Sequence, residues 1–417
     1  MEKIVMKNGL TVALEYKPSV HSAAVSIYVA AGNRFEEVDS CGMSHFIEHM
    51  VFKGTHNRSS EMIAREADMM GGQLNAYTAK EYTCFYSRAL SEHLPKTLSL
   101  MCDMLCNPKF DEQDIETEKG VVLEEIGMYE DSLEDLCSDM LNSLCYRNRS
   151  LGYNILGTRK SVSEFTADGL RRYMNKLYVP ERIVVSLCGN FEKSQVLEIL
   201  EQYFGEMDNT NNPLTFDKFG INGGVTLFQQ KASEAQVAFC FNGLEAGHEL
   251  RYAASFYSSI LGGAASSKIN RRIREELGLA YSVYSFSSSY LGTGVFGISA
   301  GLANKNQERF FKETAEIINA SRFNITADDI NMTREQFKAG IVLSNESMSA
   351  VSSSMGRQLL LEGRYVDLDS VLQEVNNVTA EQVREAARLV TDSKTVALSA
   401  VGEICDESFY KKAISNL

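Results

Sequence analysis

The sequence predicts an α+β protein made of two homologous domains, each an α/β sandwich of a mostly antiparallel sheet and helices. Strand-like and helix-like segments alternate along the first half of the chain. Residues 165–190 align without a gap to residues 378–403, at a constant offset of 213, and residues 110–115 match residues 325–330 at an offset of 215. A repeat of about 200 residues indicates two copies of one fold. The alternative is a coincidental similarity of two amphipathic helix–strand units.

The expected domain boundaries follow from this repeat. Residues 208–224 are rich in Asn, Gly and Asp and lie at the middle of the chain, which is typical of a linker. The expected domains are therefore residues 1–207 and 225–417. The periodicity of the first half predicts these elements in order: strands 10–16 and 22–31, helices 41–53 and 59–70, two strands within 74–90, helices 94–106 and 111–129, helix 166–177 and strand 183–188. A polar stretch separates the helix that ends at residue 129 from the helix that begins at residue 166.

Composition and charge restrict the partners of the chain. Its 417 residues are 44% apolar and 23% charged, as in an ordinary globular protein, and the formal net charge is −14. An acidic balance argues against nucleic acid and anionic membranes as partners, and it favours basic ligands. No apolar run approaches the roughly 20 residues of a membrane-spanning helix. The N-terminal segment has no secretory or transit pattern, so a cytoplasmic location is expected.

The nine cysteines do not form a recognisable framework. Their number is odd, their spacing is scattered and no C-x-x-C pair occurs. This usage is typical of a reducing compartment and predicts no disulfide framework. Cys102 and Cys106 are four residues apart on a predicted helix, and a metal site there is the weaker alternative.

The segment from Cys41 to Lys53 is the strongest candidate for chemistry. In a helix, His45 and His49 lie one turn apart on the same face, so that two imidazoles can hold one zinc ion. Glu48 projects near the same place and can take a proton from a zinc-bound water. The pattern H-x-x-E-H is the inverzincin motif. The alternative is an ordinary core helix that carries two histidines by accident.

A second, acidic helix is predicted between residues 111 and 129. Glu118 and Glu125 are seven residues apart and share one face, whereas Glu124 points away from it by about a third of a turn. At the offset of 215, Glu125 corresponds to Gly340, and the second half contains only one histidine, His248. The first domain is therefore expected to hold the metal, and the second to build a wall or grip a substrate.

Together these motifs resemble the pitrilysin-type zinc peptidases, and within them the class that includes the mitochondrial processing peptidase and its bacterial homologues. The resemblance implies a distal glutamate as third ligand, and Glu125, 76 residues after His49, matches it, with Glu124 as the fallback. It also implies that Glu118 supports the site. One zinc ion per chain, held by His45, His49 and Glu125, would then carry water at its fourth position.

Two further segments extend the resemblance over nearly the whole chain. Residues 71–86, GGQLNAYTAKEYTCFY, resemble the segment of the family that binds substrate, with Asn75 and Ala76 lining the peptide. Residues 261–285 resemble the second signature of the family, in which Arg274 and Tyr281 help to hold the substrate and polarise the scissile carbonyl.

The resemblance implies a zinc endopeptidase that hydrolyses peptides or short unfolded polypeptides inside a clamshell chamber, with Glu48 as general base. Because the chain has half the length of relatives that fuse both shells, a homodimer is expected. One alternative is a non-catalytic structural or processing-partner subunit of the same fold. Another is a structural zinc, whose fourth ligand would have to come from a residue such as Cys41 or Cys84.

Overall fold

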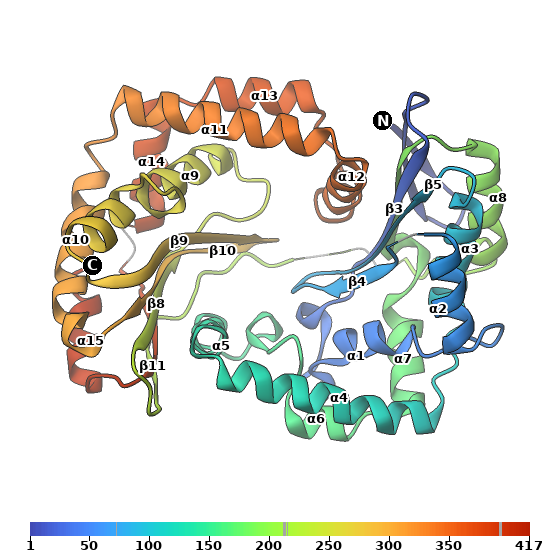
Figure 1. The fold of residues 1–417 in the computed structure, drawn as a ribbon, viewed down its shortest axis with the longest axis horizontal. Coiled ribbons are helices and arrows are strands. Elements are labelled where there is room, and N and C mark those ends of the chain that lie inside the picture. The colour runs from blue at the N-terminus through green and yellow to red at the C-terminus, as the bar shows by residue number, and fades with distance from the viewer. Residues whose placement is uncertain (72, 212–213, 215, 392–393) are drawn as a thin grey trace. The chain divides into compact units, whose positions relative to one another are not determined.

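The computed structural model describes residues 1–71, 73–211, 214, 216–391 and 394–417 (Figure 1). The chain forms two compact units, each with its own β-sheet and helices. The first unit contains residues 1–126, 153–215 and 342–367. The second unit contains residues 127–152, 216–341 and 368–417. The predicted α+β class is therefore confirmed, whereas neither compact unit is a single contiguous stretch of the chain.

The sheet of the first unit has six strands in the order β1-β2-β6-β3-β5-β4. They are β1 (Glu2–Val5), β2 (Thr11–Tyr16), β3 (Ser22–Val29), β4 (Asn75–Thr78), β5 (Thr83–Leu90) and β6 (Ile183–Gly189). Only the β2/β6 pair among them is parallel. The four strands at the centre are largely buried, and β4 lies at one edge of the sheet.

The sheet of the second unit repeats this topology. Its strands are β7 (Gly224–Gln229), β8 (Ala235–Asn242), β9 (Ala280–Tyr290), β10 (Thr293–Leu302) and β11 (Ala397–Gly402). The order β7-β11-β8-β10-β9 matches β2-β6-β3-β5-β4 strand for strand, and β7/β11 is again the parallel pair. Because the equivalent strands share both order and direction, the two units are copies of one fold, as the internal repeat predicts. Strand β1 is an addition to the first copy.

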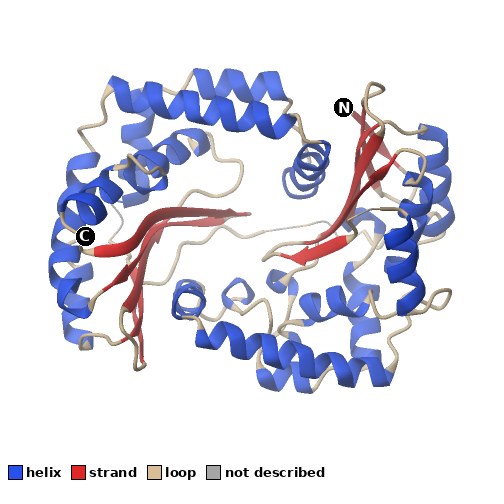
Figure 2. Cartoon of the chain, viewed as in Figure 1, coloured by secondary structure: helices blue, strands red, loops and turns tan. Residues whose placement is uncertain are grey.

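Helices pack on both sheets (Figure 2). Those of the first unit are α1 (Met43–Met50), α2 (Ser60–Met69), α3 (Leu94–Cys106), α4 (Glu112–Asp131), α6 (Arg159–Ser163), α7 (Ala167–Leu177), α8 (Lys193–Phe204) and α12 (Met348–Glu362). The last residues of α4, from Gly127 on, belong to the second unit. Helix α7 illustrates how the sequence determines them. Thr166 caps its first turn through Gly169 N–H, and the residues buried along one face follow the 3.6-residue period: Leu170, Tyr173, Met174 and Leu177.

The helices of the second unit are α5 (Leu133–Cys145), α9 (Arg251–Ser258), α10 (Gln307–Ser321), α11 (Ala327–Asn345), α13 (Leu368–Asn376), α14 (Ala380–Thr391) and α15 (Glu407–Ile414). The last residues of α11, from Val342 on, belong to the first unit. Short π-helical turns span Ser259–Gly263 and Asn270–Glu276. Among the described residues, no helix combines the length and the apolar character that crossing a bilayer requires. All nine cysteines are free thiols, and seven of them are buried.

The two copies exchange one helix each. Helix α5, from the first half of the sequence, packs on β8 and β11 of the second sheet, and α12, from the second half, packs on β3 and β6 of the first sheet (Figure 1). The two helices are equivalents, because their first residues, Leu133 and Met348, are separated by the repeat offset of 215. The contiguous division into residues 1–207 and 225–417 therefore does not describe the compact units.

The polar stretch between residues 129 and 166 contains two helices that were not predicted from the sequence, α5 and α6. The signal for α5 is present in the sequence: its buried face consists of Cys137, Leu141, Leu144 and Cys145, which follow the helical period. The expected linker, residues 208–224, includes residues 212, 213 and 215, which lie outside the described residues.

Helix α12 approaches the first sheet closely because its facing residues are small. A methyl group added at Gly356 would lie 2.5 Å from Cδ2 of Tyr28 and 2.7 Å from Oγ of Ser186. Ser352 donates a hydrogen bond to the carbonyl of Ser186, and the hydroxyl groups of Ser353 and Tyr28 are 2.5 Å apart. Pairing these buried hydroxyl groups removes the cost of burying them unsatisfied.

Candidate metal centre

Helix α1 presents the H-x-x-E-H motif on a short, buried scaffold. Gly42, at φ +89°, precedes the helix and offers no side chain to cap it. The carboxylate of Glu36 supplies the cap instead, since it accepts hydrogen bonds from the N–H groups of Gly42 and Ser44, both at 2.8 Å. The opposite face buries Phe46 and Ile47 in the core. The imidazole rings of the motif are consequently held one helical turn apart.

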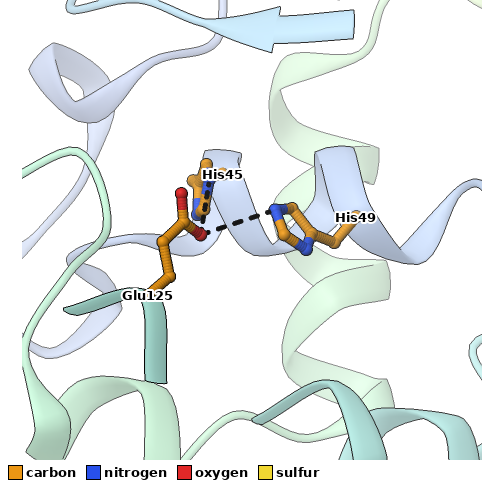
Figure 3. A group of neighbouring side chains, drawn as sticks. All are labelled: His45, His49 and Glu125. Atoms are coloured by element: carbon orange, nitrogen blue, oxygen red, sulfur yellow. Dashed lines mark ion pairs between the residues drawn. The ribbon is translucent and has the colours of Figure 1, made fainter. Parts of the chain in front are cut away.

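His45 and His49 converge with Glu125 of helix α4 (Figure 3). The ring centroids of the two histidines are 4.5 Å apart. Oε2 of Glu125 lies 3.7 Å from Nε2 of His45 and 3.9 Å from Nε2 of His49. Within the described part of the chain, these three residues form the single group of His, Cys, Asp or Glu side chains whose donor atoms lie within 4.8 Å of one another. Glu124 is exposed and does not belong to this group.

The three side chains fit a zinc ion. Two imidazole nitrogens and one carboxylate oxygen are a donor set that catalytic zinc sites use, with the fourth position left open. Ligands at about 2.05 Å in a tetrahedron are separated by about 3.3 Å, so the observed separations of 3.7 and 3.9 Å require only small side-chain movements. Burial, together with the neighbouring His49, lowers the pKa of His45 to about 3, which keeps this imidazole neutral and able to donate a lone pair.

A buried ion pair orients His49. Its Nδ1 lies 2.7 Å from Oε1 of Glu118, and Nζ of Lys53 lies 2.5 Å from Oε2 of the same carboxylate. Burial opposes the charge of Glu118, but the contacts with Lys53 and His49 outweigh it and lower the pKa of this carboxyl. An ionised carboxylate can only accept, so Nδ1 of His49 carries the proton and Nε2 is left with its lone pair toward Glu125.

Glu48 lies beside the cluster on the same helix and is half-buried. Burial raises the pKa of its carboxyl above the ordinary value, while a hydrogen bond from Thr78 opposes that shift. The hydroxyl group of Thr78 donates to Oε2 of Glu48 at 2.6 Å. A carboxyl of raised pKa next to an open metal position is suited to accept and then release a proton.

Comparison with known proteins identifies the family. The description Insulinase (Peptidase family M16) matches residues 11–159, and Peptidase M16 inactive domain matches residues 164–337. Over 401 residues, 95% of this chain and 98% of the other, the sequence is 38% identical to a Bacillus subtilis protein named uncharacterized zinc protease YmxG. The chain belongs to peptidase family M16. A Streptomyces coelicolor protein, also named uncharacterized zinc protease, is 33% identical over 98% of this chain and 90% of that protein.

Solved structures show the same fold as this M16 chain. A protease from Helicobacter pylori superposes with a TM-score of 0.87 at 19% identity, covering 96% of this chain and 99% of the other. A Pseudomonas fluorescens structure described as a peptidase M16 inactive domain superposes with a TM-score of 0.90 at 17% identity, covering 97% and 99%. At these identities the likeness concerns the fold alone.

The other residues predicted for the M16 site lie on both units. Asn75 and Ala76 begin the edge strand β4, beside α1; position 72 of the segment 71–86 lies outside the described residues. Arg274 lies in the π-helical turn Asn270–Glu276 of the second unit, where its guanidinium group is 3.7 Å from Glu275. Tyr281 lies on β9 and is 84% exposed, so its side chain is not part of the core beneath this strand.

Sequence reasoning missed three residues that contact the motif helix or its ligands. Lys53 follows His49 by four residues, a helical spacing that could have indicated their shared contact with Glu118. Thr78 and Glu36 carried no such signal, because neither lies in the motif and each reaches α1 from another element. In contrast, Cys41, Cys84, Cys102 and Cys106 do not join the metal cluster in the described part of the chain.

Proposed function

We propose that this M16 chain is a zinc-dependent endopeptidase that hydrolyses peptides or short unfolded polypeptides. The observation that carries the proposal is the convergence of His45, His49 and Glu125 beside the half-buried carboxyl of Glu48. Three ligands leave a fourth position open, as a catalytic zinc site requires and a structural one does not. The relatives named zinc proteases support the same reading.

His45 and His49 would hold the ion through Nε2, and Glu125 would hold it through a carboxylate oxygen. A bound zinc ion supplies Lewis acidity, which polarises the scissile carbonyl and lowers the pKa of water. Glu118 and Lys53 hold the imidazole of His49 in place. Glu48 takes the proton of the attacking water and passes it to the amine that leaves, which accounts for the placement of a carboxyl with a raised pKa at this position.

The edge strand β4 provides a place for the substrate. Ala79 N–H donates to the carbonyl of Tyr82, so these two residues form a hydrogen-bonded pair. Such pairs alternate along antiparallel strands, so Asn75 and Tyr77 also form hydrogen-bonded pairs with residues of β5. By alternation, the N–H and C=O groups of Ala76 and Thr78 point to the open edge. The side chain of Asn75 accepts from Ala76 N–H at 2.8 Å and so occupies one of these groups. An extended peptide that adds to this edge would replace that contact, which would explain a binding role for Asn75 and Ala76.

The second unit is proposed to bind substrate and not metal. Arg274 and Tyr281 present exposed, polar groups that suit contacts with a peptide carbonyl. We further propose that two chains form a homodimer whose units enclose the substrate as a clamshell. Because the chain is acidic, we propose that it prefers basic peptides. The proposed location is the cytoplasm. The non-catalytic subunit remains the second candidate. The matched description of residues 164–337 as an inactive domain does not cover His45, His49 and Glu125, which all precede that range.

Glu48→Gln tests the proposal. Wild type, Glu48→Gln and the control Glu116→Gln, a change at an exposed position of α4, are loaded with zinc and assayed on a quenched basic peptide with and without chelator. We expect all three proteins to retain zinc, and only Glu48→Gln to lose turnover, by about two to four orders of magnitude. Zinc binding without cleavage of any peptide in a broad library would favour the non-catalytic subunit.

A further inference from the structure

Thr78 donates the hydrogen bond that fixes the carboxylate of Glu48. Its hydroxyl group lies 2.6 Å from Oε2 of Glu48 and 3.4 Å from the hydroxyl group of Thr83. Thr83 donates its own proton to the carbonyl of Ala31 at 2.9 Å. Since an ionised carboxylate only accepts, the single proton of Thr78 is directed to Glu48. Oε2 is thereby engaged, and Oε1 is the oxygen left for a water proton.

The strand that carries Thr78 is held from its inner side. Thr78 pairs with Thr83 of β5, a fully buried residue, and Tyr77 pairs with Cys84. The hydroxyl group of Tyr77 also lies 3.3 Å from that of Tyr28, on the fully buried strand face that α12 covers. These contacts fix the position of β4 relative to α1. The position of the Thr78 hydroxyl group therefore depends on the sheet and not on the motif helix.

The main chain of Thr78 faces the other way. Its N–H and C=O groups point to the open edge of β4, because Ala79, the next residue, takes part in a hydrogen-bonded pair with Tyr82. Thr78 therefore links two parts of the site. Its main chain faces the edge to which a peptide would add, and its side chain bonds the carboxylate of Glu48, which would act on that peptide. In the described part of the chain, Thr78 is the residue of β4 whose side chain bonds a member of the H-x-x-E-H motif.

We propose that Thr78 is a positioning residue for the general base: it holds the Glu48 carboxylate in the rotamer that presents Oε1, and it links occupation of the β4 edge to that rotamer. The inference rests on the proposed peptidase function and deepens it. Loss of the hydroxyl group would leave the carboxylate free to rotate, so fewer bound substrates would meet a correctly placed base. The effect should therefore appear in kcat and not in KM.

The test compares Thr78→Val, Thr78→Ser and Thr97→Val. Valine keeps the β-branched shape that suits a strand but removes the hydroxyl group, and serine keeps the hydroxyl group. Thr97 is a buried threonine of α3 whose hydroxyl group donates to the carbonyl of His93, and it serves as the control for loss of a hydroxyl group elsewhere in the unit. We expect Thr78→Val to lower kcat about tenfold to a hundredfold, with KM and bound zinc unchanged. Thr78→Ser should restore most of kcat, and Thr97→Val should leave it at the wild-type value.

Two kinetic outcomes would overturn the inference while leaving the peptidase proposal intact. One is a Thr78→Val protein with wild-type kcat; the other is an equal fall in Thr78→Ser, which would indicate a packing role. A crystal structure of the zinc-loaded Thr78→Val protein provides a readout that does not need turnover. A changed Glu48 rotamer supports positioning by Thr78, and an unchanged rotamer contradicts it. If wild type cleaves nothing, the proposed function fails, and the rotamer still decides the role of Thr78.

Discussion

Nδ1 of His49 donates a hydrogen bond to Oε1 of Glu118 across the gap between helices α1 and α4, at 2.7 Å. Glu118 is 3% exposed, and its other oxygen is paired with Lys53. The contact selects the tautomer of the imidazole ring and fixes its plane. In the proposed site, Glu118 would therefore act through His49, in a positioning role.

Replacing Glu118 with glutamine should weaken zinc binding. The amide still offers one oxygen to Nδ1, but it carries no charge. The hydrogen bond to His49 and the contact with Lys53 are therefore both weakened. We expect the affinity for zinc to fall about 10–100-fold, measured by competition with a chelator of known affinity. Glu116→Gln, at an exposed position of the same helix, is the control. Equal affinities of the two variants would contradict the positioning role.

Glu125 and its neighbour Glu124 provide a direct test of the third ligand. Only the carboxylate of Glu125 reaches the two histidines, and Glu124 is exposed. Glu125→Gln should therefore lose zinc at concentrations at which Glu124→Gln, the same change one residue away, remains loaded. Metal analysis after gel filtration distinguishes them. Loss of zinc from Glu124→Gln alone would reassign the ligand to the residue that the sequence left as the fallback.

Glu36 should make the stability of the first unit depend on pH. Burial raises the pKa of this carboxyl to about 7, against the N–H groups of Ser44 and Gly42, which lower it. Because the folded-state pKa lies above the unfolded value, its contribution is fully present below pH 4.5 and is lost as pH rises through about 7. Glu36→Gln cannot titrate. Relative to that variant, wild type should lose on the order of 2–3 kcal/mol between about pH 5 and pH 8.

Melting curves of wild type, Glu36→Gln and Glu37→Gln over this pH range check the expectation. Glu37 is the exposed neighbour and should show no such trend relative to wild type. A constant difference in melting temperature between wild type and Glu36→Gln at every pH would show that the Glu36 carboxyl, which caps α1, does not titrate over this range.

The close approach of α12 to the first sheet predicts a large difference between two Gly→Ala changes. At Gly356, an added methyl group meets Tyr28 and Ser186 at 2.5 and 2.7 Å, whereas at Gly120 of α4 nothing lies within 4 Å. Gly356→Ala should destabilise the protein by about 1–3 kcal/mol. Gly120→Ala should stabilise it by about 0.5–1 kcal/mol, since alanine is the better helix former. Thermal unfolding measures both, and similar melting temperatures would mean that α12 does not pack on this sheet in solution.

Mixing two inactive variants tests whether Arg274 serves the metal centre of a second chain. His49→Ala removes the metal, and Arg274→Ala removes the guanidinium group of the second unit. If two chains share sites, the mixture should recover an appreciable part of wild-type activity, up to about a quarter for random pairing in a dimer. Mixing each variant with itself is the control. If the mixture is inactive although its molecular mass is that of a dimer, Arg274 does not serve the metal centre of a second chain.

The sequence alone determined what depends on neighbours along the chain. The spacing of His45, Glu48 and His49 on one helix follows from 3.6 residues per turn, and the matched segments after residues 165 and 378 revealed the duplicated fold. Helices such as α3 and α7 were predicted close to their observed ends, because the signals for them are local: an apolar period in both, a proline in the first turn of α3 and the Thr166 cap of α7. Helix α5 shows the same kind of signal, which the polar residues around it obscured.

Only the tertiary structure decided which distant residues complete the centre. The contact of Glu118 with His49 joins residues 69 apart, that of Thr78 with Glu48 joins residues 30 apart, and that of Ser353 with Tyr28 joins residues 325 apart. The exchange of α5 and α12 between the two sheets was also decided by the tertiary structure. Either sheet offers an apolar face that either helix could cover. A periodic pattern specifies which face of an element is buried. The pattern does not specify which element packs against that face, because this depends on how the whole chain packs into its two hydrophobic cores.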